Sequence, residues 1–308
     1  MVTIKEEPSY KNYGKCLTIS NDKMELIVTV DVGPRIISCS LRGKENMLHE
    51  DVARNTTQDV SSLYGEGKTW NIYGGHRLWL SPEKYPDTYY PDNEKVLYTV
   101  NGSTVEFIPP RQEVTGLQYS ILVEMDECEA QVNITHTITN AGKEPITGAA
   151  WALTVSAACG AVIVPQPKED TGLLSNRSLV LWPYTNMQDS RVFWGKNNIA
   201  LRQDPTVDQA FKIGINNTAG KLAYINHGQA MVKTFAPFDE AETYPDRGVN
   251  CEVYACKYFT ETETLSPIFT VGKNRSITHK EPWTLIDDIT IGEFTEESVA
   301  EIAAKLFG

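Results

Sequence analysis

The chain has 308 residues, of which 41% are hydrophobic and 22% are charged, an ordinary globular composition in a chain long enough to bury a core without disulfides or metal. Its formal net charge is −12 at pH 7, and no cluster of Lys and Arg stands out along the sequence. This acidity argues against nucleic acid and anionic membrane as partners, and it leaves a neutral small-molecule ligand open.

The N-terminal residues and the cysteines indicate in which cellular compartment the protein is found. The first residues contain no apolar stretch that could serve as a signal peptide, and no later window approaches the roughly 20 apolar residues of a membrane span. The six cysteines are scattered and form no C-x-x-C pair. We therefore expect a cytoplasmic protein with reduced thiols.

Short alternating segments separated by turn residues predict an all-β fold, a large antiparallel β-sandwich. Residues 24–32 alternate as a strand and end at Gly33-Pro34, and residues 35–41 read as the next strand. Residues 96–100 and 103–108 flank Asn101-Gly102, the strongest hairpin signal, because Asn-Gly accepts the positive φ values of a type I′ turn. With no linker or short-period repeat in the chain, we expect residues 1–308 to form one domain.

The second half of the chain continues this pattern. Strands are predicted at residues 119–125, 130–139, 146–155, 179–182, 210–215, 221–225, 230–234, 251–259 and 277–285. A short packing helix is predicted at the C-terminus, where Thr295 can cap the helix and where helical spacing relates Val299, Ile302, Ala303 and Leu306.

One stretch, residues 65–93, breaks the strand rhythm and reads as a long loop that concentrates aromatic and hydrogen-bonding residues. A sugar needs both kinds, because its C–H face packs on aromatic rings while its hydroxyls need fixed donors and acceptors. The loop supplies Tyr73, His76, Arg77, Trp79, Glu83 and Tyr89. The alternative is structural: the rings plug the end of the sandwich and Arg77 pairs with Glu83. Gly74-Gly75 lets the backbone pass close to a ligand or to another strand.

A second candidate segment, residues 244–254, places Asp246, Asn250 and Glu252 in a turn that runs into a strand. A carboxylate at the start of a strand of mixed polarity could be a general base, or it could be a surface charge.

The histidines add little to these candidates. His136 lies on an apolar strand face and is expected to be a core residue, whereas His49, His227 and His279 lie in polar surroundings without spaced partners. No zinc motif, Gly-x-Ser-x-Gly sequence or phosphate-binding loop is found, so we expect neither a metal nor a cofactor.

Four separated segments together resemble a bacterial branch of the galactose mutarotase-like superfamily, and their order covers nearly the whole chain. They are Asp31-Val-Gly-Pro-Arg-Ile-Ile-Ser, Tyr73-Gly-Gly-His-Arg-Leu-Trp-Leu-Ser-Pro-Glu83, Tyr244-Pro-Asp-x-Gly-x-Asn-x-Glu-Val-Tyr254, and Leu265-Ser-Pro continuing to Thr278-His-Lys-Glu-Pro-Trp-Thr-Leu285. The resemblance implies a supersandwich of antiparallel sheets with a sugar site on its concave face.

The resemblance also implies a chemistry. In the aldose 1-epimerases of the superfamily, a carboxylate removes the proton of the anomeric hydroxyl and a histidine protonates the ring oxygen, without a cofactor. Glu252 matches the position of that carboxylate before Ser266-Pro267, with Glu263 as the alternative. Arg77 is similar to the arginine that contacts the substrate.

The chain departs from the epimerases at one position. Trp151 stands approximately where the acid histidine is expected, and an indole cannot act as that acid. Either His76 supplies the acid, or the site only binds. The side chains expected to bind the sugar are Arg35, Arg77, Trp79, Glu83, Trp151, Asp246 and Glu263.

Three functions therefore remain open. The first is a sugar epimerase with Glu252 as base and His76 as acid, and the second is a sugar-binding module without turnover. The third is a lyase or hydrolase that uses Glu252 with Glu263 or Asp246. The absence of a basic cluster disfavours a phosphorylated sugar, and neither the identity of the sugar nor the oligomeric state can be predicted.

Overall fold

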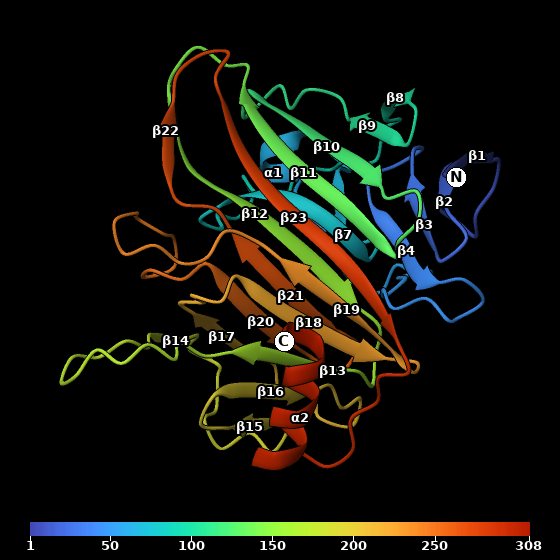
Figure 1. Cartoon of the computed structure of the whole chain (residues 1–308). Coiled ribbons are helices and arrows are strands. Elements are labelled where there is room, and N and C mark those ends of the chain that lie inside the picture. Colours follow the sequence, from blue (N-terminus) through green and yellow to red (C-terminus); the bar gives the residue numbers. More distant parts are fainter.

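Two large antiparallel sheets packed face to face make up the protein, as a computed structural model of residues 1–308 shows (Figure 1). The first sheet runs in the order β1-β2-β3-β4-β7-β12-β21-β20-β17-β14, with β22 paired to β12. Its strands are β1 (Thr3–Glu7), β2 (Cys16–Ser20), β3 (Met24–Thr29), β4 (Ile36–Leu41), β7 (Gly75–Ser81), β12 (Ile146–Ser156), β14 (Leu179–Leu181), β17 (Phe211–Ile215), β20 (Cys251–Ala255), β21 (Thr260–Leu265) and β22 (Phe269–Val271).

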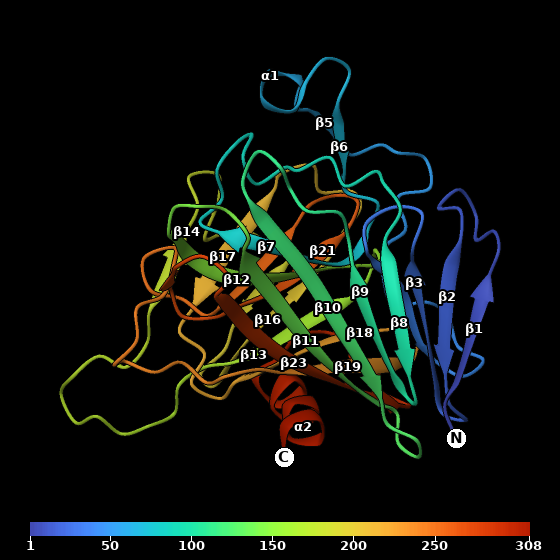
Figure 2. The ribbon, with the colours of Figure 1, turned by 90° about the horizontal axis from the view of Figure 1, so that it is seen from above.

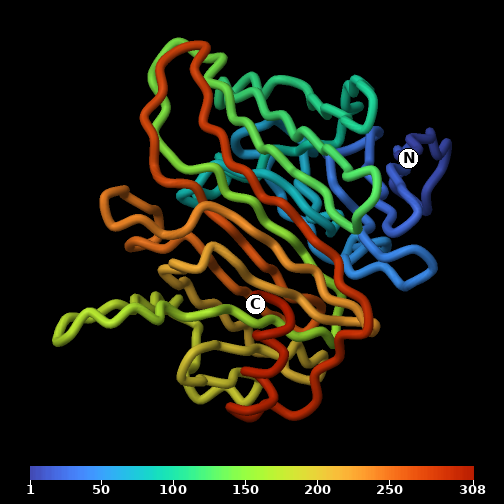
Figure 3. Tube along the Cα trace, viewed as in Figure 1, coloured from blue at the N-terminus to red at the C-terminus, as the bar shows by residue number.

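The second sheet runs in the order β15-β16-β13-β18-β19-β23-β11-β10-β9-β8. Its strands are β8 (Leu97–Asn101), β9 (Thr104–Ile108), β10 (Leu117–Met125), β11 (Gln131–Asn140), β13 (Ala161–Pro165), β15 (Val192–Trp194), β16 (Asn198–Arg202), β18 (Lys221–Asn226), β19 (Gln229–Thr234) and β23 (Ser276–Asp287). The tube in Figure 3 follows the long β11 and β23 side by side, and these strands pair from Gln131–Thr284 to Thr139–Ser276.

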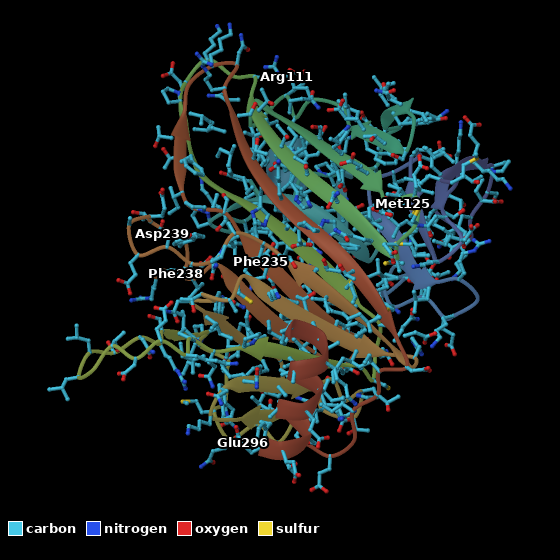
Figure 4. All side chains as sticks on the ribbon, viewed as in Figure 1. Arg111, Met125, Phe235, Phe238, Asp239 and Glu296 are labelled. Carbon is cyan, nitrogen blue, oxygen red and sulfur yellow. The ribbon has the colours of Figure 1, made fainter.

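The remaining elements lie on the outer faces of the two sheets. A small sheet of β5 (Thr57–Asp59) and β6 (Thr69–Asn71), with α1 (Ser61–Tyr64), projects on the side opposite to α2 (Glu296–Phe307) (Figure 2). In Figure 4, Glu296 marks the start of α2 at one end of the molecule, and Arg111 lies at the other end. No helix is long and apolar enough to cross a membrane.

The core lies between the two sheets because strand alternation turns apolar side chains inward. One cluster of 41 buried hydrophobic residues draws on both sheets. On β20, for example, Cys251 and Val253 belong to this core, while Glu252 and Tyr254 alternate with them and face away from the second sheet. The outer face of the first sheet is therefore free to carry polar and aromatic side chains.

The all-β prediction is confirmed, together with several of its local elements. Asn101-Gly102 joins β8 to β9, and Gly102 has a positive φ of 61°. Thr295 caps α2 in a capping box with Ser298, and Val299, Ala303 and Leu306 are the buried residues of that helix. All six cysteines are free thiols in the structure.

One prediction of local structure is wrong in a way that matters for the site. Residues 75–81 were expected in a long loop, and instead they form β7, a central strand of the first sheet between β4 and β12. Gly74 and Gly75 precede it with positive φ, and a Cβ at either would lie 2.1 Å from a backbone oxygen, of His49 or of Ile36. The two glycines therefore pass close to other strands of the fold.

Candidate functional site

A hollow of about 360 Å³ opens on the outer face of the first sheet, the face turned away from the second sheet. Aromatic rings make up much of its wall, and four charged side chains join them. The rings belong to Trp70, Trp79, Tyr89, Trp151, Trp182, Tyr184, Tyr254 and Phe259, and the charged side chains are Arg77, Glu83, Lys212 and Glu261.

Strand alternation and register bring these side chains together. On β7 and β12, Trp79 pairs with Trp151, and Leu153 pairs with Arg77. On β21, Glu261 and Glu263 face the same way as Leu153 and Val155 of β12. Across β20, Glu252 is the register partner of Glu263, and Lys212 of β17 is the partner of Tyr254. Five adjacent strands thus present alternate residues to one surface.

Arg77 forms the first charged contact of the hollow. Its Nη1 donates to Glu261 Oε1 at 3.1 Å, and its guanidinium lies 4.3 Å from the centre of the Trp79 ring. Its Nε is buried without a hydrogen-bond partner. Burial raises the pKa of Glu261, and Arg77 opposes that rise. The carboxyl group of Glu261 is therefore a weaker acid than an exposed glutamate.

Lys212 forms the floor of the hollow above two fully buried carboxyl groups. Its Nζ lies 2.8 Å from Glu252 Oε2 and 2.9 Å from Glu263 Oε2, and the indole N–H of Trp151 donates to the same Glu263 oxygen at 2.8 Å. Burial would lower the pKa of Lys212, but Glu263 and Glu252 together raise it well above its usual value. Lys212 is therefore a permanent cation.

Glu252 was predicted as the base, and the structure places it on the outer face of the first sheet, buried against Lys212. Its side chain is 0% exposed, and burial raises its pKa well above the usual value although Lys212 opposes this. Asp246, on the preceding turn, adds to the rise in pKa and does not line the hollow. Glu263 is buried in the same way.

His76 does not face the hollow, so the prediction that it serves as the acid there is wrong. On β7 its neighbours Arg77 and Trp79 alternate outward, which turns His76 into the space between the sheets. Its ring is fully buried, with Nε2 2.7 Å from His136 Nε2 and Nδ1 2.7 Å from Thr154 Oγ1. His136 is a core residue as predicted.

Arg35 also lies away from the hollow. Its Nη1 donates to Asp92 Oδ2 at 2.6 Å, and the two residues line a separate cavity of about 30 Å³. The alternative pairing of Arg77 with Glu83 is wrong as well, since Arg77 pairs with Glu261 and Glu83 accepts a hydrogen bond from the Tyr89 hydroxyl. His279, expected in polar surroundings, is buried, and its Nε2 lies 2.7 Å from Thr264 Oγ1.

Two functional candidates were missed in the sequence. Glu261 could have been found, because Glu261-Thr-Glu263 places two carboxylates on one strand face. Lys212 gives no such signal, since it meets Glu263 from 51 residues away in the chain. Trp182 and Tyr184 follow β14 and complete the wall beside Lys212, whose Nζ lies 4.7 Å from the centre of the Trp182 ring.

Several solved structures have an architecture similar to that of this chain. A galactose mutarotase-like protein from Lactobacillus casei matches 88% of this chain and 100% of its own at 10% identity, with a TM-score of 0.57. A candidate aldose 1-epimerase from Klebsiella pneumoniae matches 99% and 88% at 13% identity, with a TM-score of 0.59.

The chain has the galactose mutarotase-like fold. The resemblance predicted from its four segments is thereby confirmed at the level of architecture. The same fold occurs in a TPR-domain containing protein from Parabacteroides distasonis, where 90% of this chain matches 48% of that chain at 13% identity, with a TM-score of 0.59. This chain thus spans about half of that protein. No family model and no curated protein matches the sequence.

Proposed function

We propose that the hollow on the outer face of the first sheet binds a carbohydrate. The observation that carries the proposal is the joint presence of ring faces and fixed polar groups around a space of about 360 Å³. Trp79 and Trp151 offer apolar faces to the C–H side of a sugar ring, and Arg77 and Glu261 offer a donor and an acceptor to its hydroxyls. The solved mutarotase-like proteins with this fold support the same ligand class by their names.

Binding without turnover is the function that the geometry supports best. In the epimerases that the sequence resembles, a histidine protonates the ring oxygen, but no histidine lines this hollow. His76 is held between the sheets, and Glu252 is covered by Lys212. Neither half of the acid–base pair predicted from the sequence therefore reaches a ligand in the hollow.

A direct test measures binding of common hexoses by isothermal titration to the wild type and to Trp79→Ala. We expect the wild type to bind at least one hexose and Trp79→Ala to weaken that binding at least about tenfold, because a stacked ring is lost. Tyr258→Ala is the matched control, since Tyr258 is an exposed aromatic residue outside the hollow. Equal binding by Trp79→Ala and the wild type would place the sugar elsewhere.

A second candidate function is a cofactor-free sugar isomerase, favoured by the position of Glu261. Its carboxyl group lines the hollow, lies 3.1 Å from Arg77 Nη1 and has a raised pKa, the direction that favours exchange of a proton with a ligand. One-dimensional NMR of freshly dissolved α-anomers shows whether the protein accelerates mutarotation. Acceleration that Glu261→Gln abolishes would support the isomerase, and no acceleration for any sugar that binds would leave a binding protein.

A further inference from the structure

Two cations, Arg77 and Lys212, and two carboxyl groups, those of Glu83 and Glu261, line the hollow. Two further carboxyl groups, those of Glu252 and Glu263, lie buried against Lys212. Both cations are already engaged: Lys212 is shared between Glu252 and Glu263, and Arg77 is paired with Glu261. The protein therefore offers no free positive charge to an anionic ligand.

Glu83 is the carboxylate of the hollow that lacks a cation. It accepts a hydrogen bond from the Tyr89 hydroxyl and forms no ion pair with a lysine or arginine of the chain. Burial raises the pKa of Tyr184 to about 12, and although Lys212 opposes this, Glu263, Glu83 and Glu261 add to it. Three carboxyl groups thus act on one hydroxyl at the wall of the hollow.

Aromatic rings stand beside Glu83. Tyr89 lies with its ring centre 5.0 Å from that of Trp79 and 5.1 Å from that of Trp70. Ring faces next to a carboxylate stabilise a bound ammonium, because the ring quadrupole and the negative charge attract it together. Arg77 and Lys212 already make such contacts with Trp79, Trp151 and Trp182, which shows that the wall accommodates cations.

Unpartnered donors in the same wall point to a ligand that also carries hydroxyl oxygens. The indole N–H of Trp70 and the Nε of Arg77 are buried without hydrogen-bond partners, and the two residues are 3% exposed and line the hollow. Buried donors are seldom left unpaired in folded proteins, because each costs free energy. A sugar hydroxyl or ring oxygen would satisfy them.

We infer that the ligand is an amino sugar whose protonated amine lies beside Glu83 and the rings of Tyr89, Trp70 and Trp79, an inference that rests on the proposed carbohydrate site. The hydroxyl groups of the ligand meet Trp70 and Arg77, and its amine supplies the positive charge that the hollow lacks. Sugar phosphates and uronic acids are disfavoured, since each would bring a negative charge toward the uncompensated carboxylate of Glu83.

The test is a titration of four probes at a slightly acidic pH where the sugar amine is protonated: glucosamine, N-acetylglucosamine, glucose and glucuronate. We expect glucosamine to bind at least about tenfold more tightly than glucose, a factor within the range of a charge-assisted hydrogen bond, and glucuronate to bind most weakly. N-acetylglucosamine, whose amide is uncharged, should lose the advantage.

Glu83→Gln is the decisive variant, because Glu83 is exposed and forms no ion pair, so we expect its replacement to leave the fold intact. It should reduce the ratio of glucosamine to glucose affinity to about one, because the charge that distinguishes the two sugars is lost. Glu127→Gln, an exposed acidic residue outside the hollow, is the matched control and should keep the ratio.

The outcomes separate this inference from the proposed function. Tightest binding of glucuronate, or equal binding of glucose and glucosamine, would overturn the amino-sugar inference while carbohydrate binding stands. A glucosamine preference that Glu83→Gln retains would overturn the role of Glu83. Failure of all four probes to bind would contradict the carbohydrate proposal itself, and this inference with it.

Discussion

At the scale of single residues, Lys212 is the side chain that links the buried carboxyl groups beneath the hollow. Its Nζ lies within ion-pair distance of two buried carboxyl groups, those of Glu252 and Glu263, which no other cation contacts. A buried ion pair is not in itself strong evidence for stability, because desolvation offsets much of the attraction. Removing one partner is different, since it leaves charge buried and uncompensated.

We therefore expect Lys212→Met to lower the free energy of unfolding by about 3–5 kcal/mol at neutral pH. Urea denaturation measures this. The double variant Lys212→Met/Glu263→Gln should recover part of the loss, because the amide at position 263 leaves no buried charge without a partner there. Lys257→Met, which breaks the exposed pair with Asp208, is the control and should change stability little. A Lys212→Met protein as stable as the wild type would show that the pair is not buried as described.

The same residues show how far the site could be predicted from the sequence. Arg77, Trp79 and Trp151 were predicted from the motifs and line the hollow. His76 was misplaced because a single step of strand parity decides which side of the sheet a residue faces. Because residues 75–81 were predicted as a loop, no alternation of faces was assigned to them.

At the scale of elements, β7 contributes to two different environments. Its outward residues form the hollow, and His76 joins a buried polar network with His136 of β11 and His279 of β23. His136 Nδ1 donates to the His279 carbonyl at 3.1 Å, so its Nε2 accepts from His76. Every proton in this chain of contacts therefore has an acceptor while the rings are neutral.

Neutral histidines in the folded state predict sensitivity to acid. Burial lowers the pKa of His136 to about 4 and that of His279 to about 3, from 6.5, and that of His76 is also lowered. The unfolded chain therefore binds these protons first, so stability is full above pH 6.5 and falls as the pH drops below it. Protonation of each of His136 and His279 should lower the free energy of unfolding by roughly 2 kcal/mol between pH 7 and pH 5.

His136→Gln tests this at the level of one residue. We expect this variant to be less stable than the wild type at neutral pH. Between pH 7 and pH 5, however, its free energy of unfolding should fall by less than that of the wild type, and the difference should equal the contribution of one histidine. His227→Gln, which alters a surface histidine beside Glu45, should follow the wild type. Urea midpoints at several pH values give the comparison, and identical pH slopes for wild type and His136→Gln would contradict the account. Lys233 and Glu281 pair at 3.0 Å within the network and are unchanged in all three proteins.

At the scale of the whole molecule, strand existence was predictable and sheet order was not. Alternation of apolar and polar residues shows which segments form half-buried strands, and together with Asn101-Gly102 it predicted the β8–β9 hairpin. The pairing of β7 with β12, or of β4 with β7, joins segments separated by long stretches of chain. Such neighbours depend on tertiary packing, which leaves no local signature in one sequence.

The two outer faces of the sandwich are covered differently, and only one of them carries the hollow. Helix α2 packs on the outer face of the second sheet and buries Val299, Ala303 and Leu306 against it. On the first sheet, the β5–β6 hairpin contributes Trp70, which packs against Trp79 at 5.3 Å between ring centres and walls the hollow. One outer face is thus closed by a helix, and the other remains open to a ligand.

The central claim is that a sugar occupies the hollow between β7, β12, β21 and β17. A crystal structure of the protein soaked with the tightest-binding sugar of the titration panel tests it most directly. The account predicts density for a sugar ring against Trp79 or Trp151, with hydroxyls within hydrogen-bond reach of Arg77 and Glu261. A sugar seated at any other surface, with this hollow holding only solvent, would contradict it.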